Sequence, residues 1–153
     1  MGYTHYFPHT KISNKKWDKI VEDCKTLNNM LAEYASSDIE VAGWDGEGDP
    51  VFDDNEICFN GKGEELSHET FTLRKTGPEV KDWMDVNEIP FAFCKTARKP
   101  YDLLVCGCLL VYKHYSPKTI DLGSDGENED WADAETFVKS SLGYDEKYLN
   151  KLK

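Results

Sequence analysis

The stretch Pro100–His114, PYDLLVCGCLLVYKH, decides the fold. From Leu103 to Val111 every residue is apolar or glycine, so a helix here is apolar on all sides and must be buried on most of them. Pro100 suits the first position of a helix, where its missing N–H costs little. Asp102 in the first turn complements the helix dipole. The pattern therefore predicts a buried central helix over residues 100–114.

The segment before this helix, FCKTARKP (Phe93–Pro100), carries a positive charge that is unusual in this chain. The whole chain has 18 Lys and Arg against 29 Asp and Glu, a net charge of −11. A strand end, a short loop and a helix start form the geometry in which backbone N–H groups point at an anion. The loop side chains would add hydroxyl and charge-assisted hydrogen bonds. They are Lys95, Thr96, Arg98 and Lys99.

Two kinds of anion would fit this loop. The first is a bound ligand with a phosphate or carboxylate group, although the loop lacks the glycines of a phosphate-binding loop. The second is internal pairing, in which Arg98 and Lys99 contact carboxylates of the chain itself, such as Asp102 or the run 125–130. Spacing alone does not decide between them.

The other segments predict short strands and surface helices. Residues 13–35 have an apolar stripe at helical spacing, with Ser13 as the N-cap, and predict a helix packed on a sheet. Residues 130–143 predict a second surface helix and 145–153 a last helical piece, whereas 76–88 are expected to be irregular. Strands are predicted at 2–7, 39–44, 56–61, 68–75, 90–96 and near 119–124.

This order of elements predicts the fold class. Middle strands joined by short loops pair antiparallel. We expect one α+β domain over residues 1–153, with an antiparallel-dominated sheet of about five or six strands. The buried helix 100–114 would pack centrally on that sheet, with two or three further helices around it.

Composition excludes several classes of protein. An acidic chain lacks the many Lys and Arg that general binding to nucleic acid backbones requires. The apolar run Leu103–Tyr112 is too short to span a bilayer, and the start MGYTHYFPHTK does not resemble a signal peptide. We therefore expect a cytoplasmic protein without membrane or general nucleic-acid partners, and leave a homo-oligomer open.

Cysteine and histidine spacing gives no sign of a metal site. The chain has five cysteines, an odd number without a CxxC pair, and we interpret them as reduced core residues. The four histidines lie on different predicted elements. The acidic stretch 45–56 has Pro50 where a calcium-binding EF-hand loop needs glycine. We expect no metal and no cofactor.

Further candidate ligand residues come from the strands. Alternation places Thr4 and Tyr6 on one face of the first strand, where they would offer hydroxyls and an aromatic plane. His5 lies on the opposite face, and we expect it to be a hydrogen-bonded core histidine.

Four more side chains complete the candidate site. His68 beside Asn60 would contact a ligand, or would be a solvated strand end. Asp125 follows a strand and would line the same mouth as the basic loop. Tyr101 would stack on a base, as would Tyr6 or Trp131.

Five sequence motifs together resemble a family of small phage and prophage proteins. They are MGYTHY, FNG, HETF, FCKTARKPYD and SDGENEDW, and they occur in the same order across nearly the whole chain. The family has no established function. The resemblance implies a phage context and a compact α+β domain, but no particular chemistry. Small phage proteins outside the virion often act on host defence or host metabolism.

The leading hypothesis is a module that binds a small phosphate-bearing molecule, such as a nucleotide signal of host defence, in the host cytoplasm. A second hypothesis is an inhibitor that uses its acidic surface against a host protein. A third is an enzyme acting on a nucleotide or metabolite. The sequence shows no convergent acid, base and nucleophile, so we favour a protein that is not an enzyme.

Overall fold

The computed structural model describes residues 3–8, 12–34, 39–75, 91–115 and 122–144. Its helices are α1 (Asn14–Tyr34), α2 (Gly63–Leu66), α3 (Asp102–Tyr115) and α4 (Ala132–Leu142), with short 3-10 turns η1 (Trp44–Gly46) and η3 (Asn128–Trp131). Its strands are β1 (Thr4–Pro8), β2 (Val41–Ala42), β3 (Val51–Phe52), β4 (Glu56–Gly61), β5 (Phe71–Arg74), β6 (Phe91–Lys95) and β7 (Gly123–Ser124). The segments 76–88 and 145–153 lie outside the described residues.

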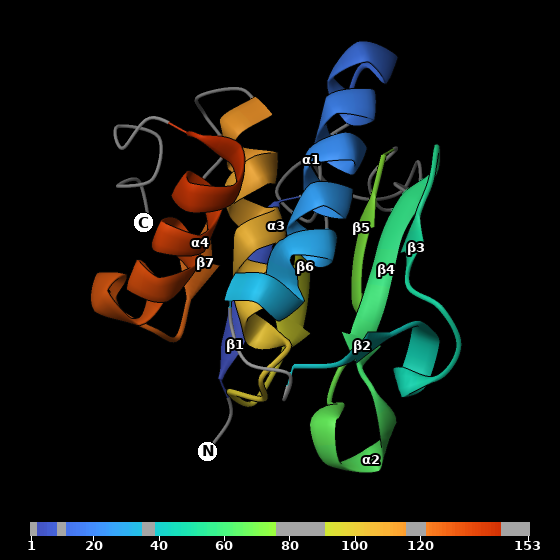
Figure 1. The fold of residues 1–153 in the computed structure, drawn as a ribbon, viewed down its shortest axis with the longest axis vertical. Coiled ribbons are helices and arrows are strands. Elements are labelled where there is room, and N and C mark those ends of the chain that lie inside the picture. Colours follow the sequence, from blue (N-terminus) through green and yellow to red (C-terminus); the bar gives the residue numbers. More distant parts are fainter. Residues whose placement is uncertain (1–2, 9–11, 35–38, 76–90, 116–121, 145–153) are drawn as a thin grey trace, which may run out of the picture.

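The strands form two antiparallel sheets. One has the order β6-β1-β7, and in the other β4 pairs with β2, β3 and β5. The predicted α+β class and antiparallel pairing are confirmed, but the strands divide between two sheets where the sequence indicated one. The physical reason is that β6 pairs with the N-terminal strand β1, with His5 opposite Cys94, instead of extending the sheet of β4 and β5. Figure 1 shows the larger sheet to one side of the long helices.

Helix α3 is the centre of the molecule, as predicted. Its residues Leu104–Tyr112 are all buried, and it packs against α1 and α4. Gly107 permits the close packing, because a Cβ atom there would lie 3.1 Å from Leu27 Cδ1 of α1. The helix begins at Asp102, two residues after the predicted start, since 3-10-type hydrogen bonds such as Asp102 N–H to the Lys99 carbonyl precede it.

One hydrophobic core joins all the main elements. The apolar stripe of α1 is buried as predicted, and Ser13 Oγ accepts the Lys16 N–H at 3.3 Å as an N-cap does. This stripe, both sheets, α3 and α4 contribute to a single continuous cluster of buried side chains. All five cysteines are buried and reduced, as expected. Within the described ranges, no helix has the length and apolar character needed to cross a membrane.

Candidate functional site

The basic loop of the sequence forms a tight turn over residues 95–99, which we call the cationic turn. The Lys99 N–H donates to the Thr96 carbonyl at 3.0 Å, and the two residues between them, Ala97 and Arg98, have φ angles of 51° and 60°. A left-handed conformation costs about 1–2 kcal/mol for each residue with a Cβ atom. Backbone hydrogen bonds hold the turn, because the N–H groups of Thr96 and Ala97 both donate to the Tyr3 carbonyl.

The cationic turn displays Arg98 at the surface. Its guanidinium carbon lies 3.9 Å from the centre of the Tyr3 ring, and Nη1 lies 3.4 Å from Oδ1 of Asp130. The Arg98 side chain is nevertheless 61% exposed. This one long contact uses one of the five N–H donors of the guanidinium. Arg98 is therefore oriented by its neighbours and still has donors for a planar anion.

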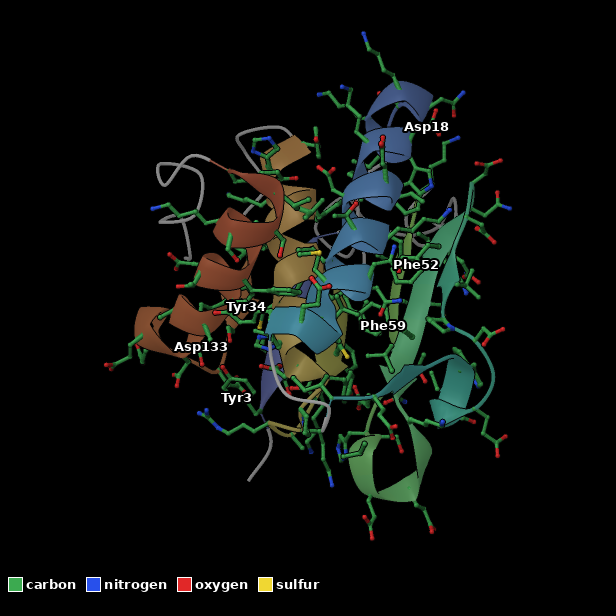
Figure 2. All side chains as sticks on the ribbon, viewed as in Figure 1. Tyr3, Asp18, Tyr34, Phe52, Phe59 and Asp133 are labelled. Carbon is green, nitrogen blue, oxygen red and sulfur yellow. The ribbon has the colours of Figure 1, made fainter. Side chains whose placement is uncertain are left out.

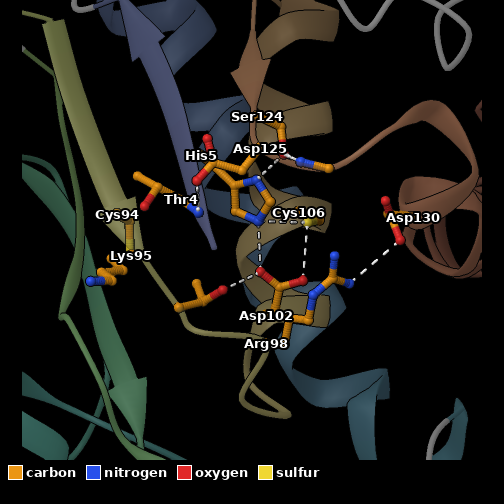
Figure 3. A network of polar contacts seen from close by, with 12 residues as sticks. Thr4, His5, Cys94, Lys95, Arg98, Asp102, Cys106, Ser124, Asp125 and Asp130 are labelled. Carbon is orange, nitrogen blue, oxygen red and sulfur yellow. Dashed lines mark hydrogen bonds and ion pairs between the residues drawn. The ribbon is translucent and has the colours of Figure 1, made fainter. Parts of the chain in front are cut away.

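The two lysines of the turn form hydrogen bonds instead of ion pairs in the described part of the chain. Lys99 Nζ donates to the carbonyl oxygen of Glu65 at 2.8 Å, and the Lys95 backbone N–H donates to Glu69 Oε1 at 2.8 Å. Across the described part of the chain, neither lysine forms an ion pair. Figure 3 shows that Lys95 and Arg98 lie on opposite sides of the turn. The three cations thus flank the turn and do not line a common pocket.

Next to the cationic turn lies a polar cluster of His5, Thr96, Asp102, Cys106 and Ser124, called here the His5 cluster (Figure 3). The His5 ring is fully buried, with Nε2 at 2.6 Å from Asp102 Oδ1 and Nδ1 at 2.8 Å from Ser124 Oγ. Thr96 Oγ1 donates to the same Asp102 oxygen at 2.6 Å. Cys106 Sγ lies 3.4 Å from His5 Nε2 and 3.6 Å from Asp102 Oδ2.

Three elements bring this cluster together. His5 is on the central strand of its sheet, opposite Cys94 of β6 and Ser124 of β7. Asp102 and Cys106 are four residues apart on α3 and therefore share a helix face. The rings of Tyr3 and Trp131 both pack edge-on against His5 with centroids 5.0 Å away. The expected hydrogen-bonded core histidine is confirmed, whereas its partners were not predicted.

Several residues predicted to touch a ligand are hydrogen-bonded inside the protein. Thr96 is buried against Asp102, and Tyr101 is buried with its hydroxyl donating to the Glu69 carbonyl. Trp131 is also fully buried, so neither of these two rings is exposed for stacking on a base. Of the predicted site residues, Arg98, His68 and Asp125 are exposed, whereas Lys95 and Lys99 are half-buried.

Asn60 and His68 form a separate contact between β4 and the segment before β5. Asn60 is buried, and its amide nitrogen donates to the carbonyl of His68 and to Thr70 Oγ1. Its Oδ1 accepts the N–H groups of Gly61 and His68. Every hydrogen-bonding position of the amide is filled, so Asn60 fixes the chain and leaves the exposed His68 imidazole at the surface.

Thr4, Tyr6 and Asp125 meet at one end of the smaller sheet. The Thr4 N–H donates to Asp125 Oδ2 at 3.1 Å, and the Tyr6 hydroxyl lies 3.5 Å from Oδ1. Asp125 is exposed and its own N–H donates to the Thr4 carbonyl. The Asp125 carboxylate accepts hydrogen bonds at the end of the sheet, and its negative charge would repel an anion bound there.

The order Ser124, His5, Asp102 matches the order of nucleophile, base and orienting acid in acyl-transfer enzymes. Such a site also needs backbone N–H groups that stabilise an oxyanion. The two N–H groups after Ser124 are already used, since Asp125 donates to the Thr4 carbonyl and Gly126 to Ser124 Oγ. Burial also raises the pKa of the Cys94 and Cys106 thiols, which disfavours either as a nucleophile. The residues that the structure describes therefore do not complete a hydrolytic site.

Comparison with known proteins adds no relative: no family model, no curated protein and no solved structure matches this chain.

Proposed function

We propose that the protein binds a small phosphate-bearing ligand at the cationic turn. The observation that carries this proposal is the state of Arg98, which is stacked on Tyr3, held by one long contact to Asp130 and otherwise exposed. A guanidinium with a fixed plane and free donors is suited to two parallel hydrogen bonds with phosphate oxygens. In a chain with a net charge of −11, such a display of cations is unusual.

The strained backbone supports the same proposal. Ala97 and Arg98 are both left-handed, and conformations of this kind persist where the surrounding structure imposes them, often at ligand sites. Lys95 and Lys99 form no ion pair within the described ranges, and their charge would favour an anion bound at Arg98 without contacting it. A multiply charged phosphate gains more from this positive potential than a single carboxylate does.

In the phage setting that the sequence motifs imply, such a module would sequester a nucleotide signal of the host. The module would need no catalytic group. It would act in the host cytoplasm by lowering the free concentration of the signal.

The first test is a thermal-shift panel with inorganic phosphate, pyrophosphate, and mono-, di- and cyclic nucleotides. A ligand that binds the folded state raises the melting temperature by mass action. We expect a shift with at least one member for the wild type and none for Arg98→Ala. The matched control is Arg74→Ala, because Arg74 is 59% exposed and lies 3.8 Å from Glu56, much as Arg98 lies near Asp130. The proposal is wrong if no ligand shifts the wild type, or if Arg98→Ala responds like Arg74→Ala.

Asp130 provides an independent test with the opposite sign. Its carboxylate contacts Arg98 and would compete with a bound anion for the same guanidinium. The N–H of Glu127 and then Arg98 lower the pKa of Asp130, so it is ionised at neutral pH. Asp130→Asn keeps an oxygen for the Glu127 N–H, and we expect it to bind the phosphate ligand more tightly than the wild type in calorimetry. Weaker binding would show that Asp130 supports the site instead of competing with it.

A second candidate function is binding to a basic host protein. It is favoured by Trp44, which is 63% exposed and lies in an acidic turn with Asp45, Glu47 and Asp49. An exposed tryptophan within charged residues is a common anchor of protein interfaces. A pull-down from host lysate at low and high salt tests this function. We expect a salt-sensitive partner that Trp44→Ala loses; a partner retained by that variant would contradict the assignment.

A further inference from the structure

The His5 cluster contains a set of three metal-ligating side chains that no part of the proposed function uses. An imidazole nitrogen, a carboxylate oxygen and a thiol sulfur come from His5, Asp102 and Cys106, and these atoms all lie within 4.8 Å of one another. This set was not predicted from the sequence, because it combines one histidine from β1 with two ligands from successive turns of α3, far away along the chain.

The distances resemble those of a tetrahedral centre. In a zinc site with Zn–S near 2.3 Å and Zn–N or Zn–O near 2.0–2.2 Å, the sulfur lies about 3.5 Å from each nitrogen or oxygen ligand. Here Cys106 Sγ lies 3.4 Å from His5 Nε2 and 3.6 Å from Asp102 Oδ2. Two edges of the tetrahedron are thus present without any movement of the helix.

The third edge involves a hydrogen bond that a metal would replace. His5 Nε2 lies 2.6 Å from Asp102 Oδ1, which is shorter than the separation of two ligands on one ion. The other carboxylate oxygen, Oδ2, is the one that faces Cys106. A cation held by Nε2, Oδ2 and Sγ would leave Oδ1 to Thr96, and the Asp102 carboxylate would turn away from its present hydrogen bond with His5.

The surrounding contacts are those that support metal ligands. A ligating histidine usually donates its other ring N–H to an oxygen, and His5 Nδ1 lies 2.8 Å from Ser124 Oγ. The carboxylate is in turn fixed by Thr96 Oγ1 at 2.6 Å. Both partners of the ligands are therefore already in place and set the orientation of the ring and of the carboxylate.

Burial distinguishes the two sides of the site. His5 and Cys106 are buried, whereas the Asp102 side chain is 20% exposed. The exposed side could supply a water molecule as a fourth ligand, which is the arrangement of three protein ligands and one open position found in catalytic zinc sites.

We propose that His5, Asp102 and Cys106 bind a divalent transition-metal ion of the zinc class. The mixed nitrogen, oxygen and sulfur ligands suit zinc or cobalt better than calcium or magnesium, which prefer oxygen ligands alone. On binding, the Cys106 thiol forms a metal–sulfur bond and its proton passes to the solvent. The metal itself carries the positive charge that compensates the buried thiolate.

The test is a titration of the reduced, chelator-treated protein with Co(II), which reports a cobalt–thiolate bond by a near-ultraviolet charge-transfer band and a tetrahedral field by visible absorption. We expect both signals in the wild type and their disappearance when excess Zn(II) is added. Cys106→Ser should lose the charge-transfer band. Cys108→Ser is the matched control, because Cys108 is a buried cysteine on the same helix outside the cluster, and it should keep the band.

Circular dichroism of each variant before the titration verifies that the variant is folded. If Cys106→Ser does not fold, Asp102→Asn provides the second variant, since it keeps the size of the side chain and should shift the visible bands or weaken binding. A wild type without a charge-transfer band, or a band that persists in folded Cys106→Ser, would overturn the proposal and leave the cluster as a hydrogen-bond network. No phosphate ligand is used, so the outcome is independent of the proposed function.

Discussion

At the scale of single residues, backbone conformation explains which positions the chain cannot change freely. Gly61 ends the FNG motif, and a Cβ atom there would lie 1.8 Å from the Leu66 carbonyl oxygen. The motif is therefore explained by close approach of the backbone, with Asn60 hydrogen-bonding the same loop. At Ala97 and Arg98, by contrast, residues with a Cβ atom occupy left-handed conformations that glycine would adopt with less strain.

We predict that Gly61→Ala lowers the free energy of unfolding by about 3 kcal/mol, the upper range for overpacking a rigid site. Gly63→Ala is the matched control, because Gly63 has a φ of +73° but nothing within 4 Å of the added Cβ, and it should cost about 1 kcal/mol. Urea unfolding monitored by tryptophan fluorescence compares the two. If both variants lost the same free energy of unfolding, contact with Leu66 would not be the reason that position 61 requires glycine.

The strained turn gives a prediction of stabilisation. Ala97→Gly should raise the free energy of unfolding by up to about 1 kcal/mol, because relief of the left-handed strain exceeds the added entropy of the unfolded chain. Ala92→Gly is the control on the adjoining strand β6 and should destabilise the protein. Chemical denaturation measures both changes. If Ala97→Gly destabilised the protein as much as Ala92→Gly, the turn would not be strained.

At the scale of elements, the sequence was informative wherever the pattern is local. The run Leu103–Val111 predicted a buried helix because no face of it is polar, and α3 is buried as expected. The pairing of β1 with β6 and β7 could not be predicted, since strands so far apart in the chain carry no local signal of their partners. The His5 cluster depends on this pairing, and for that reason its composition was missed although His5 itself was placed in the core.

The turn between β3 and β4 provides a prediction for pH. Asp53 Oδ1 accepts the N–H groups of Asn55 at 2.8 Å and Glu56 at 3.0 Å, and these bonds lower the pKa of Asp53 from its ordinary value of 3.8. A depressed folded pKa stabilises the protein fully above the unfolded value, and this contribution is lost as the pH falls through the folded value.

We therefore expect Asp53→Asn to lower the melting temperature at neutral pH and to show a smaller further loss below about pH 4 than the wild type. The neighbouring exposed residue gives the control variant Asp54→Asn, which should keep the acid dependence of the wild type. Melting temperatures across this pH range test the prediction. An acid dependence of Asp53→Asn equal to that of the wild type would contradict it.

At the scale of the whole molecule, one carboxylate links three helical segments. Asp23 of α1 accepts hydrogen bonds at Oδ2 from the hydroxyls of Tyr115, at the end of α3, and Tyr144, just after α4, at 2.7 and 2.6 Å. Burial raises the pKa of both tyrosines, to about 12 for Tyr115, so they remain donors at neutral pH. The contact closes the helical layer at the end opposite the cationic turn.

Asp23→Ala should lower the free energy of unfolding by about 2 kcal/mol, the range for losing hydrogen bonds to a charged acceptor. Asp18→Ala on the same helix is the control, because Asp18 is exposed (Figure 2) and should change stability by less than about 0.5 kcal/mol. Thermal and urea unfolding measure the difference. Similar small losses for both variants would mean that the tyrosines find other partners.

The central claim is that the cationic turn binds an anion although the molecule as a whole is acidic. The most direct measurement is calorimetric titration with pyrophosphate of the wild type, Arg98→Ala and Arg74→Ala. We predict equal binding by the wild type and Arg74→Ala, and binding weakened at least about tenfold in Arg98→Ala, as expected when a charge-assisted hydrogen-bond pair is removed. No binding heat in the wild type, or equal weakening in both arginine variants, would contradict the account.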